Sequence, residues 1–289
     1  RRGLSESDLG QCGARAILQA LQEEGVEEVP SVRTTGRILE RRGVLDSRGR
    51  TRRAPPPKGW YLPEVAAGRA ELDSFDVVEG LVIKGGPAVE VLNGVSLLGG
   101  LVTSFPRTAI TAQASLEFIL EHWRQFGLPA YAQFDNATLF QGPHHHADAI
   151  GRGVRMCLSL GVVPVFVPPR EPGFQAAVEN YNGQWQSKVW ARFQHSSLAE
   201  LQQRSQRYVA AHRASPAQRI DAAPPRAPFP KHWRLNLRAS LHGRIFFLRR
   251  TNEHGQANFL GHRFLVDAQW LRRLVRAEVD LDQQIISFY

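Results

Sequence analysis

Residues 173–193 read GFQAAVENYNGQWQSKVWARF and show the clearest local pattern in the chain. The stretch contains good helix formers, no internal proline and a single acidic residue, Glu179. At helical spacing an apolar stripe and a polar stripe lie side by side. The apolar stripe is Val178, Tyr181, Trp185 and Val189, and the polar stripe is Gln175, Glu179, Asn182 and Gln186. The pattern predicts a helix that packs on a core and presents one carboxylate to a neighbouring surface.

Two more acidic residues lie in or just after apolar segments upstream. Residues 130–134 (AYAQF) are predicted to form a short strand that ends at Asp135, and open α/β sheets bind ligands at such strand ends. Residues 74–78 (SFDVV) embed Asp76 in another strand. A lone glutamate on a helix is usually solvated, but buried carboxylates that converge repel one another and require cations. Hard divalent cations prefer oxygen ligands, so the three acids predict a metal site.

Two acids compete for the first position of this site. Asp73 shares its strand face with Phe75, which has the character of a core residue. Asp76 shares the opposite face with Ser74 and Val78. We therefore prefer Asp76 as the first acid and keep Asp73 as the alternative.

Three motifs carry a resemblance to a known family. They are LDSFDVVE at 72–79, QFDN at 133–136 and GFQAAVENYN at 173–182. In these motifs the chain resembles the DDE integrase/transposase family of ribonuclease H-like enzymes, most clearly over residues 71–213. Both flanks are more weakly similar to bacterial insertion-sequence transposases. The family pattern Asp-x-x-Glu falls on Asp76 and Glu79, which supports Asp76 as the first acid.

The resemblance implies a fold, a cofactor and roles for individual residues. The expected fold is an α/β ribonuclease H-like core, a mixed sheet flanked by helices. Asp76, Asp135 and Glu179 are the implied catalytic residues, and they are expected to bind two Mg²⁺ or Mn²⁺ ions. Asn182 and Lys188, further along the Glu179 helix, are candidate DNA contacts.

The element order expected for residues 71–213 is βββαβαβαα. Strands are predicted at 72–83, 88–97, 100–106, 130–134 and 162–167, and helices at 110–126, 148–160, 174–193 and 198–213. Glycine-containing turns separate the first three strands. This order agrees with the ribonuclease H-like fold that the resemblance implies.

Residues 1–45 are predicted to be a helical, helix-turn-helix-like DNA-binding segment. One helix is expected over residues 8–24, and a second begins after Ser31, the predicted N-cap. The predicted basic face of the second helix consists of Arg33, Arg37, Arg41 and Arg42. Such a pair is typical of half a helix-turn-helix unit, and a solvated basic helix is an equal alternative.

Two proline-rich segments, 46–70 and 214–230, are predicted to be linkers. In the first, Trp60 and Tyr61 are expected to dock the chain on the core. Residues 231–289 contain short alternating segments that predict a small C-terminal β-barrel that binds DNA. Its expected phosphate contacts are Arg249, Arg250, Arg272 and Arg273.

The positive charge of the chain is concentrated in its flanks. The net charge of the 289 residues is +9. Residues 1–70 carry 13 basic and 9 acidic side chains, residues 71–213 carry 11 and 12, and residues 214–289 carry 12 and 6. Basic arms around a metal-dependent core suit a polyanion such as DNA, although solubility alone also explains a net charge. No apolar run reaches membrane-spanning length.

The cysteines and histidines predict no further metal site. Cys12 and Cys157 lie in different predicted domains, which argues against a disulfide or zinc framework and fits a reducing cytosol. The three histidines at 144–146 are a poor zinc site because consecutive residues cannot all face one metal. Their loop is interpreted as a lid on the substrate side.

These features predict a transposase or integrase that carries out metal-dependent DNA cleavage and strand transfer. The expected partners are DNA element ends, target DNA and further copies of the chain, with no membrane. The expected location is the bacterial cytoplasm, in association with the nucleoid. Two alternatives remain open, a ribonuclease H-type nuclease and a transposase-derived DNA-binding protein without catalysis.

Overall fold

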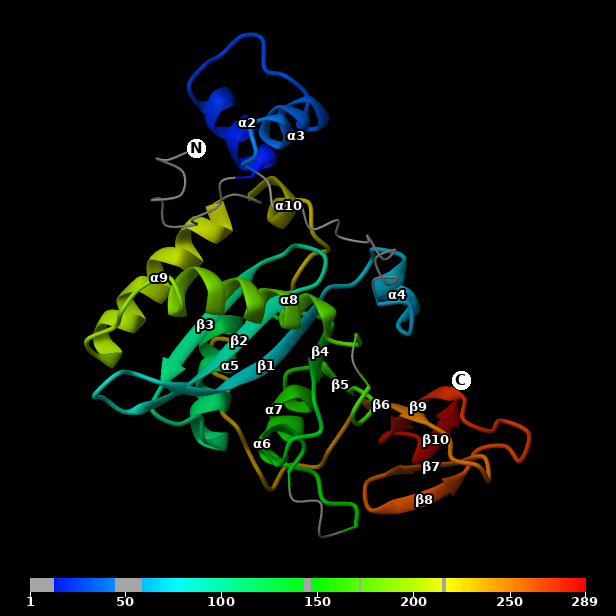
Figure 1. Ribbon diagram of the computed structural model, residues 1–289. Coiled ribbons are helices and arrows are strands. Elements are labelled where there is room, and N and C mark those ends of the chain that lie inside the picture. The colour runs from blue at the N-terminus through cyan, green and yellow to red at the C-terminus, as the bar shows by residue number, and fades with distance from the viewer. Residues whose placement is uncertain (1–12, 45–58, 143–146, 172, 215–216) are drawn as a thin grey trace.

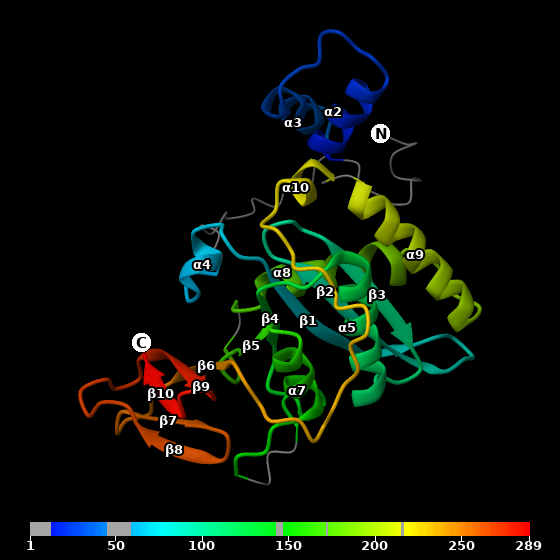
Figure 2. The same cartoon turned by 180° about the vertical axis from the view of Figure 1, so that it is seen from behind.

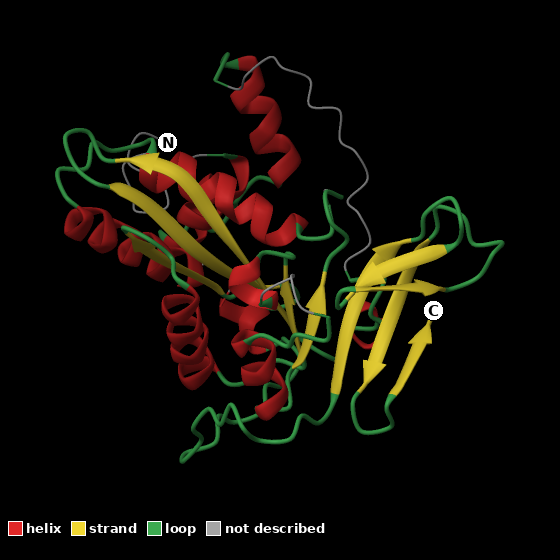
Figure 3. Ribbon diagram, turned by 90° about the horizontal axis from the view of Figure 1, so that it is seen from below, coloured by secondary structure: helices red, strands yellow, loops and turns green. Residues whose placement is uncertain are grey.

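The fold is built around one long mixed β-sheet (Figure 1). A computed structural model describes residues 13–44, 59–142, 147–171, 173–214 and 217–289. The strands are β1 (Leu72–Val82), β2 (Ala88–Ser96), β3 (Val102–Arg107), β4 (Tyr131–Phe134), β5 (Val163–Phe166), β6 (Arg244–Arg250), β7 (Gln256–Phe259), β8 (His262–Leu265), β9 (Leu274–Asp280) and β10 (Ile285–Phe288). Within the described residues, eight of them form a sheet in the order β10-β9-β6-β5-β4-β1-β2-β3, and β7 pairs with β8 in a second sheet (Figure 3).

Helices cover both faces of the sheet. They are α2 (Ala14–Glu23), α3 (Val32–Arg41), α4 (Pro63–Ala66), α5 (Ala112–Phe126), α6 (Thr138–Gln141), α7 (Arg152–Ser159), α8 (Ala176–Trp185), the π-helix η1 (Gln186–Trp190), α9 (Leu198–Ala214) and α10 (Ala217–Asp221). α5, α6 and α7 pack on one face, and α8, η1 and α9 pack on the other (Figures 1 and 2). In the described part of the chain, no helix is long and apolar enough to cross a membrane.

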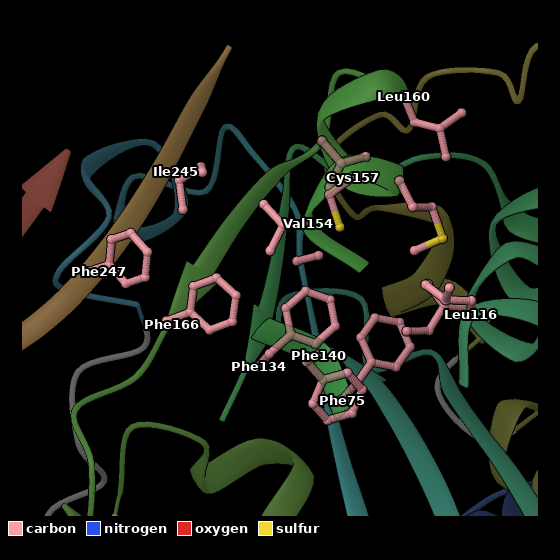
Figure 4. Close-up of a cluster of buried hydrophobic side chains, with 14 of the residues drawn as sticks. Phe75, Leu116, Phe134, Phe140, Val154, Cys157, Leu160, Phe166, Ile245 and Phe247 are labelled. Atoms are coloured by element: carbon pink, nitrogen blue, oxygen red, sulfur yellow. The ribbon is translucent and has the colours of Figure 1, made fainter. Parts of the chain in front are cut away.

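Strand alternation divides the interior into two main cores. β1, β2 and β3 form an antiparallel meander, and β4 and β5 continue the sheet parallel to β1. Along β1, Phe75 enters the core on the α5 side, whereas Val78 enters the core on the α8 side. Figure 4 shows the first core, where Phe134 stacks on Phe75 and Phe140 with ring centroids 5.8 and 4.9 Å apart.

The mixed sheet flanked by helices, predicted from the sequence, is confirmed. The order βββαβαβαα is present, with a short additional helix, α6, after β4. The Glu179 helix also differs from expectation, because it continues as the π-helix η1 after Trp185. A π-helix adds one residue to a turn, and such segments are frequent near functional sites.

The C-terminal strands do not form the separate small barrel expected for residues 231–289. β6 pairs in parallel with β5, through Val165 opposite Phe246 and Phe166 opposite Phe247, and β9 and β10 follow in antiparallel order. Apolar side chains of these strands, such as Phe247 and Val275, belong to the same core as Phe75. The strands extend the central sheet because their apolar faces complete its core.

The segment expected to be the second linker is in contact with the core. Arg219 donates to the carbonyl oxygens of Leu97 and Leu98, at 2.9 and 2.6 Å. Ala227 exchanges backbone hydrogen bonds with Leu128, at 2.7 and 3.0 Å. The segment begins with α10, and the prolines after this helix interrupt regular structure, but the backbone still bonds to the core. The domain boundaries themselves remain a prediction.

The N-terminal helices α2 and α3 form a small pair. The Ser31 side chain accepts a hydrogen bond from the backbone N–H of Thr34 at 3.1 Å, which confirms the predicted N-cap. The four arginines of α3 are exposed as expected. Two apolar residues of α3, Val32 and Ile38, are 47% and 37% exposed, whereas Leu39 is buried. α3 packs mainly on α2, so its buried face is narrow.

Candidate active site

β1 and β4 bring the first two acids to the same level of the sheet. The parallel register pairs Ser74 of β1 with Gln133 of β4. Asp76 and Asp135 each lie two residues further along, so alternation puts both on the same face. The Asp135 carboxylate also accepts a hydrogen bond from the backbone N–H of Ala137 at 3.0 Å, which fixes the turn after β4.

α8 adds the third acid from above this face. Its residues Val178 and Tyr181 are buried in the same core as Val78. Gln175, immediately before α8, donates to the carbonyl oxygen of Phe75 at 3.1 Å and so fixes the start of the helix against β1. Glu179 lies in the first turn of α8 and is exposed beside the sheet.

The charges of Asp135 and Glu179 act on Asp76. Burial, followed by the negative charges of Asp135 and Glu179, raises the pKa of Asp76 from 3.8 to about 6. Hydrogen bonds to Asp76, including one from Asn182, oppose this change. Burial also raises the pKa of Asp135. Mutual repulsion of carboxylates in a partly desolvated place is typical of functional sites.

Two amides hold the Asp76 carboxylate in place. Asn182 of α8 donates to Asp76 Oδ2 at 2.7 Å, and its own Oδ1 accepts from Asn93 of β2 at 2.8 Å. Asn93 lies directly opposite Asp76 in the antiparallel register. Asn182 was predicted to contact DNA, but its side chain is buried and donates to Asp76 instead. Asn93 was not predicted as a site residue, although a polar residue inside an otherwise apolar strand indicates a buried polar contact.

Asp73, the alternative first acid, has a complete set of partners on the other face of β1. Arg226 donates to its two carboxylate oxygens at 2.9 and 2.5 Å, and Trp123 Nε1 donates at 3.1 Å. His122 Nε2 lies 3.4 Å from Asp73 Oδ2. Asp73 is therefore part of the buried structure, and the geometry favours Asp76.

The donor set fits a hard divalent cation, although the side chains are not closed around one. Among the described residues, no group of three or more His, Cys, Asp or Glu side chains is arranged to hold a metal ion. Asp76 is turned toward Asn182, and Asp135 toward the N–H of Ala137. Carboxylate oxygens are the ligands that Mg²⁺ and Mn²⁺ prefer, and a cation relieves their repulsion.

Arg249, predicted to contact phosphate, is buried. Its guanidinium donates to the carbonyl oxygens of Asn258, Val167 and Leu248 and to Asn136 Oδ1, the last at 2.7 Å. Burial lowers its pKa to about 10. Arg249 therefore does not present an exposed guanidinium to phosphate. Arg249 instead supports the turn that carries the second acid, because Asn136 is the next residue after Asp135.

The other predicted DNA contacts lie on separate elements. Arg250 forms two hydrogen bonds of 2.7 Å with Glu171, so its charge is already paired. Arg272 and Arg273 are exposed just before β9, and Lys188 is half-buried in η1. Arg33, Arg37, Arg41 and Arg42 occupy the exposed face of α3. The acids and Asn182 therefore come together, whereas the basic residues are distributed over the surface.

Some predictions lie outside the described residues. They concern the histidines at 144–146, Cys12 and the first linker up to residue 58. Cys157 is a buried free thiol, and burial raises its pKa. In the same linker, Tyr61 is buried against the core as expected, while Trp60 is 51% exposed.

Comparison with solved structures finds retroviral integrase chains of low identity. A chain of the simian T-cell lymphotropic virus intasome in complex with PP2A regulatory subunit B56 gamma is 16% identical, covers 92% of this chain and 85% of its own, and gives a TM-score of 0.42. The HTLV-2 integrase catalytic core domain in complex with magnesium is 15% identical, with coverages of 48% and 82% and a TM-score of 0.36. The BIV integrase catalytic core domain is 20% identical, with coverages of 46% and 79% and a TM-score of 0.36.

These likenesses are partial. All three TM-scores lie below 0.5, so the likenesses alone assign neither a fold nor an activity. No family model matches the chain, and no curated protein matches it.

Proposed function

We propose that this protein is a metal-dependent DNA-cleaving and strand-transferring enzyme of the integrase/transposase type. The observation that carries the proposal is that Asp76, Asp135 and the Glu179 helix lie on the same side of the sheet, where burial and then the charges of Asp135 and Glu179 raise the pKa of Asp76 to about 6. The acids come from β1, the end of β4 and α8, as the DDE motif resemblance implies. Like charges held together in a partly buried place reduce the stability of the fold, and such arrangements are typical of functional sites.

Asp76, Asp135 and Glu179 are the proposed ligands of two Mg²⁺ or Mn²⁺ ions. When bound, the two ions supply activation of the attacking oxygen and stabilisation of the leaving oxygen in phosphoryl transfer. Asn182 orients the Asp76 carboxylate through its 2.7 Å hydrogen bond. Arg249 holds the Asp135 turn through Asn136. Both are positioning residues in this proposal.

The proposed partner is DNA, bound by the basic flanks. The exposed basic residues offered for phosphate are Arg33, Arg37, Arg41 and Arg42 of α3 and Arg272 and Arg273 before β9. Strand transfer handles two element ends and one target, and one triad acts on one end. The proposed active form is therefore a homo-oligomer on DNA. The proposed catalytic core is residues 71–213, and the proposed location is the bacterial cytoplasm, in association with the nucleoid.

Activity tests should compare Asp76→Asn with Glu121→Gln. Glu121 is an exposed acid of α5, on the opposite face of the sheet, so it is a control for loss of one negative charge. With Mg²⁺, Asp76→Asn should lower nicking of supercoiled plasmid by about a thousandfold or more, roughly 4 kcal/mol of transition-state stabilisation, and Glu121→Gln should leave it unchanged.

Two results would change the assignment. Full nicking by Asp76→Asn would remove it from the active site. Nicking without joining of a cleaved 3′ end to target DNA would indicate a nuclease of the ribonuclease H type.

A further inference from the structure

A cavity of about 350 Å³ lies between the segment before α4, the sheet and the start of α8. This volume is near the lower end of the roughly 300–1,000 Å³ that small-molecule sites occupy. One wall is the segment before α4, with Trp60 and Tyr61. The other walls are β1, β4 and the start of α8. Of the described residues that line the cavity, none is charged, although the chain as a whole carries a net charge of +9.

The cavity is formed by the same three elements that carry the acids. Each acid has a neutral polar residue of the cavity wall shortly before it in sequence and on the same face. The pairs are Ser74 and Asp76 in β1, Gln133 and Asp135 at β4, and Gln175 and Glu179 at the start of α8. Two residues of strand, or one turn of helix, separate the members of each pair, about 5–7 Å. A group held in the cavity is therefore about one nucleotide away from a group held at the acids.

The exposed ring of Trp60 lies at the rim of the cavity, next to the buried ring of Tyr61. Tyr61 is 7% exposed, and its hydroxyl donates to the carbonyl oxygen of Phe174 at 3.1 Å while accepting from Gln133 at 2.5 Å. Trp60 is 51% exposed beside it, with ring centroids 5.9 Å from Tyr61 and 6.5 Å from Phe174. The exposed indole thus has a rigid neighbour on one side and open space on the other.

We propose that this cavity binds one unpaired nucleobase of the DNA strand whose phosphodiester lies at the acids. The inference rests on the proposed function and adds a feature of the substrate. A base is flat, uncharged and polar at its edge, which fits the Trp60 and Phe174 rings, the uncharged lining and the amides of Gln133 and Asn180. A phosphate group does not fit, because no basic side chain of the described residues lines the cavity. The preferred substrate is then a strand with a base freed from its pair next to the reactive bond.

A binding cycle between protein and DNA variants tests this. The probes are a deoxythymidine decamer and an abasic decamer, which carry the same number of phosphates and differ only in their bases. Affinities are measured by fluorescence anisotropy in the Glu179→Gln background with Mg²⁺, so that binding is measured without cleavage. Stacking on one aromatic residue contributes about 1–3 kcal/mol per base, so Trp60→Ala should weaken binding of the thymidine decamer roughly 5- to 100-fold. The abasic decamer should bind both proteins equally.

Two further variants keep the outcome interpretable. Trp60→Phe retains a ring and should recover most of the affinity for the thymidine decamer. Trp270→Ala is the matched control, since Trp270 is another exposed tryptophan, 39% accessible, that does not line the cavity. In Trp270→Ala, the ratio of the affinities for the two decamers should be the same as in the Glu179→Gln background.

An equal effect of Trp60→Ala on both decamers, or no effect on either, would overturn the inference. Either result is distinguishable from failure of the proposed function, which appears instead as absence of Mg²⁺-dependent cleavage by the wild-type protein. If Trp60→Ala weakens binding of the thymidine decamer only and the wild-type protein shows no cleavage, the cavity is a base-binding site in a DNA-binding protein without catalysis.

Discussion

Two aspartates of β1, three residues apart, lie in opposite environments. Asp73 points into the core on the α5 side, where Arg226, Trp123 and His122 surround its carboxylate. Asp76 points to the α8 side, where its neighbours include two other acids. Burial alone would raise the pKa of Asp73, but the charge and hydrogen bonds of Arg226 outweigh it and hold that pKa well below its ordinary value. The pKa of Asp76 is raised to about 6.

The difference separates a structural acid, Asp73, from a candidate functional acid, Asp76. Both residues are aspartates in one strand, so strand propensity and local sequence do not distinguish them. Their partners do, since Asp73 has a cation that balances its charge and Asp76 is repelled by like charges. A balanced carboxylate contributes to stability, whereas a repelled one reduces it and marks a place where a cation or substrate is expected.

The largest effect on stability is expected from Asp73→Asn. It leaves Arg226 buried without its anion, and breaking a buried ion pair in this way costs about 3–5 kcal/mol. Urea unfolding should show this loss, measured as a lower midpoint with an unchanged slope. The double variant Asp73→Asn with Arg226→Met should recover part of it. A loss below 1 kcal/mol would contradict the structural role of Asp73.

The second prediction concerns the pH dependence of unfolding. Asp73 has a lowered native pKa, so its stabilisation is complete above the ordinary aspartate value of about 3.9 and is lost as the pH falls through the native pKa. His122 has a pKa lowered by burial, so a further loss begins below its ordinary value of 6.5. The stability advantage of the wild type over Asp73→Asn should therefore persist down to about pH 4 and shrink below it, as the pH falls toward the native pKa of Asp73. Parallel curves would show that Asp73 is not ion-paired.

The smallest effect, with the opposite sign, is expected from the same substitution at the other position. Asp76 has a raised native pKa, so its contribution is lost as the pH rises from about 3.9 through about 6. The change from 3.8 to about 6 corresponds to roughly 3 kcal/mol, which solvent screening reduces to about 1–2 kcal/mol. At pH 7 with a chelator, Asp76→Asn should be more stable than the wild type by that amount. A destabilised Asp76→Asn would show that the acids do not repel one another.

Local pattern was sufficient to predict much of the core sheet. The alternation of Ser74, Asp76 and Val78 against Phe75 predicted the two faces of β1, and the structure has them in that arrangement. The N-cap at Ser31 also follows from local chemistry. These features depend on neighbours within a few residues, which the sequence displays directly.

Contacts between distant segments were not predictable in the same way. Arg226 lies 153 positions from Asp73 in a proline-rich stretch whose composition is typical of a linker. The apolar run of β6, RIFFLRR, predicts a strand but does not identify β5 as its partner. Arg249 resembles a surface arginine, and only the carbonyl groups gathered around it explain its burial. The approach of Asn182 to Asp76 likewise requires the α8 packing to be known.

The parallel pairing of β6 with β5 has a consequence for solubility. β5 has the sequence VPVF over Val163–Phe166, and its last three residues are buried. Without β6, this short apolar strand would be an open edge that offers unpaired backbone groups to other chains, which is a common origin of aggregation. The residues from Arg244 onward thus cover this edge of the central sheet. Removal of the C-terminal strands should therefore expose β5 and promote aggregation of the remaining chain.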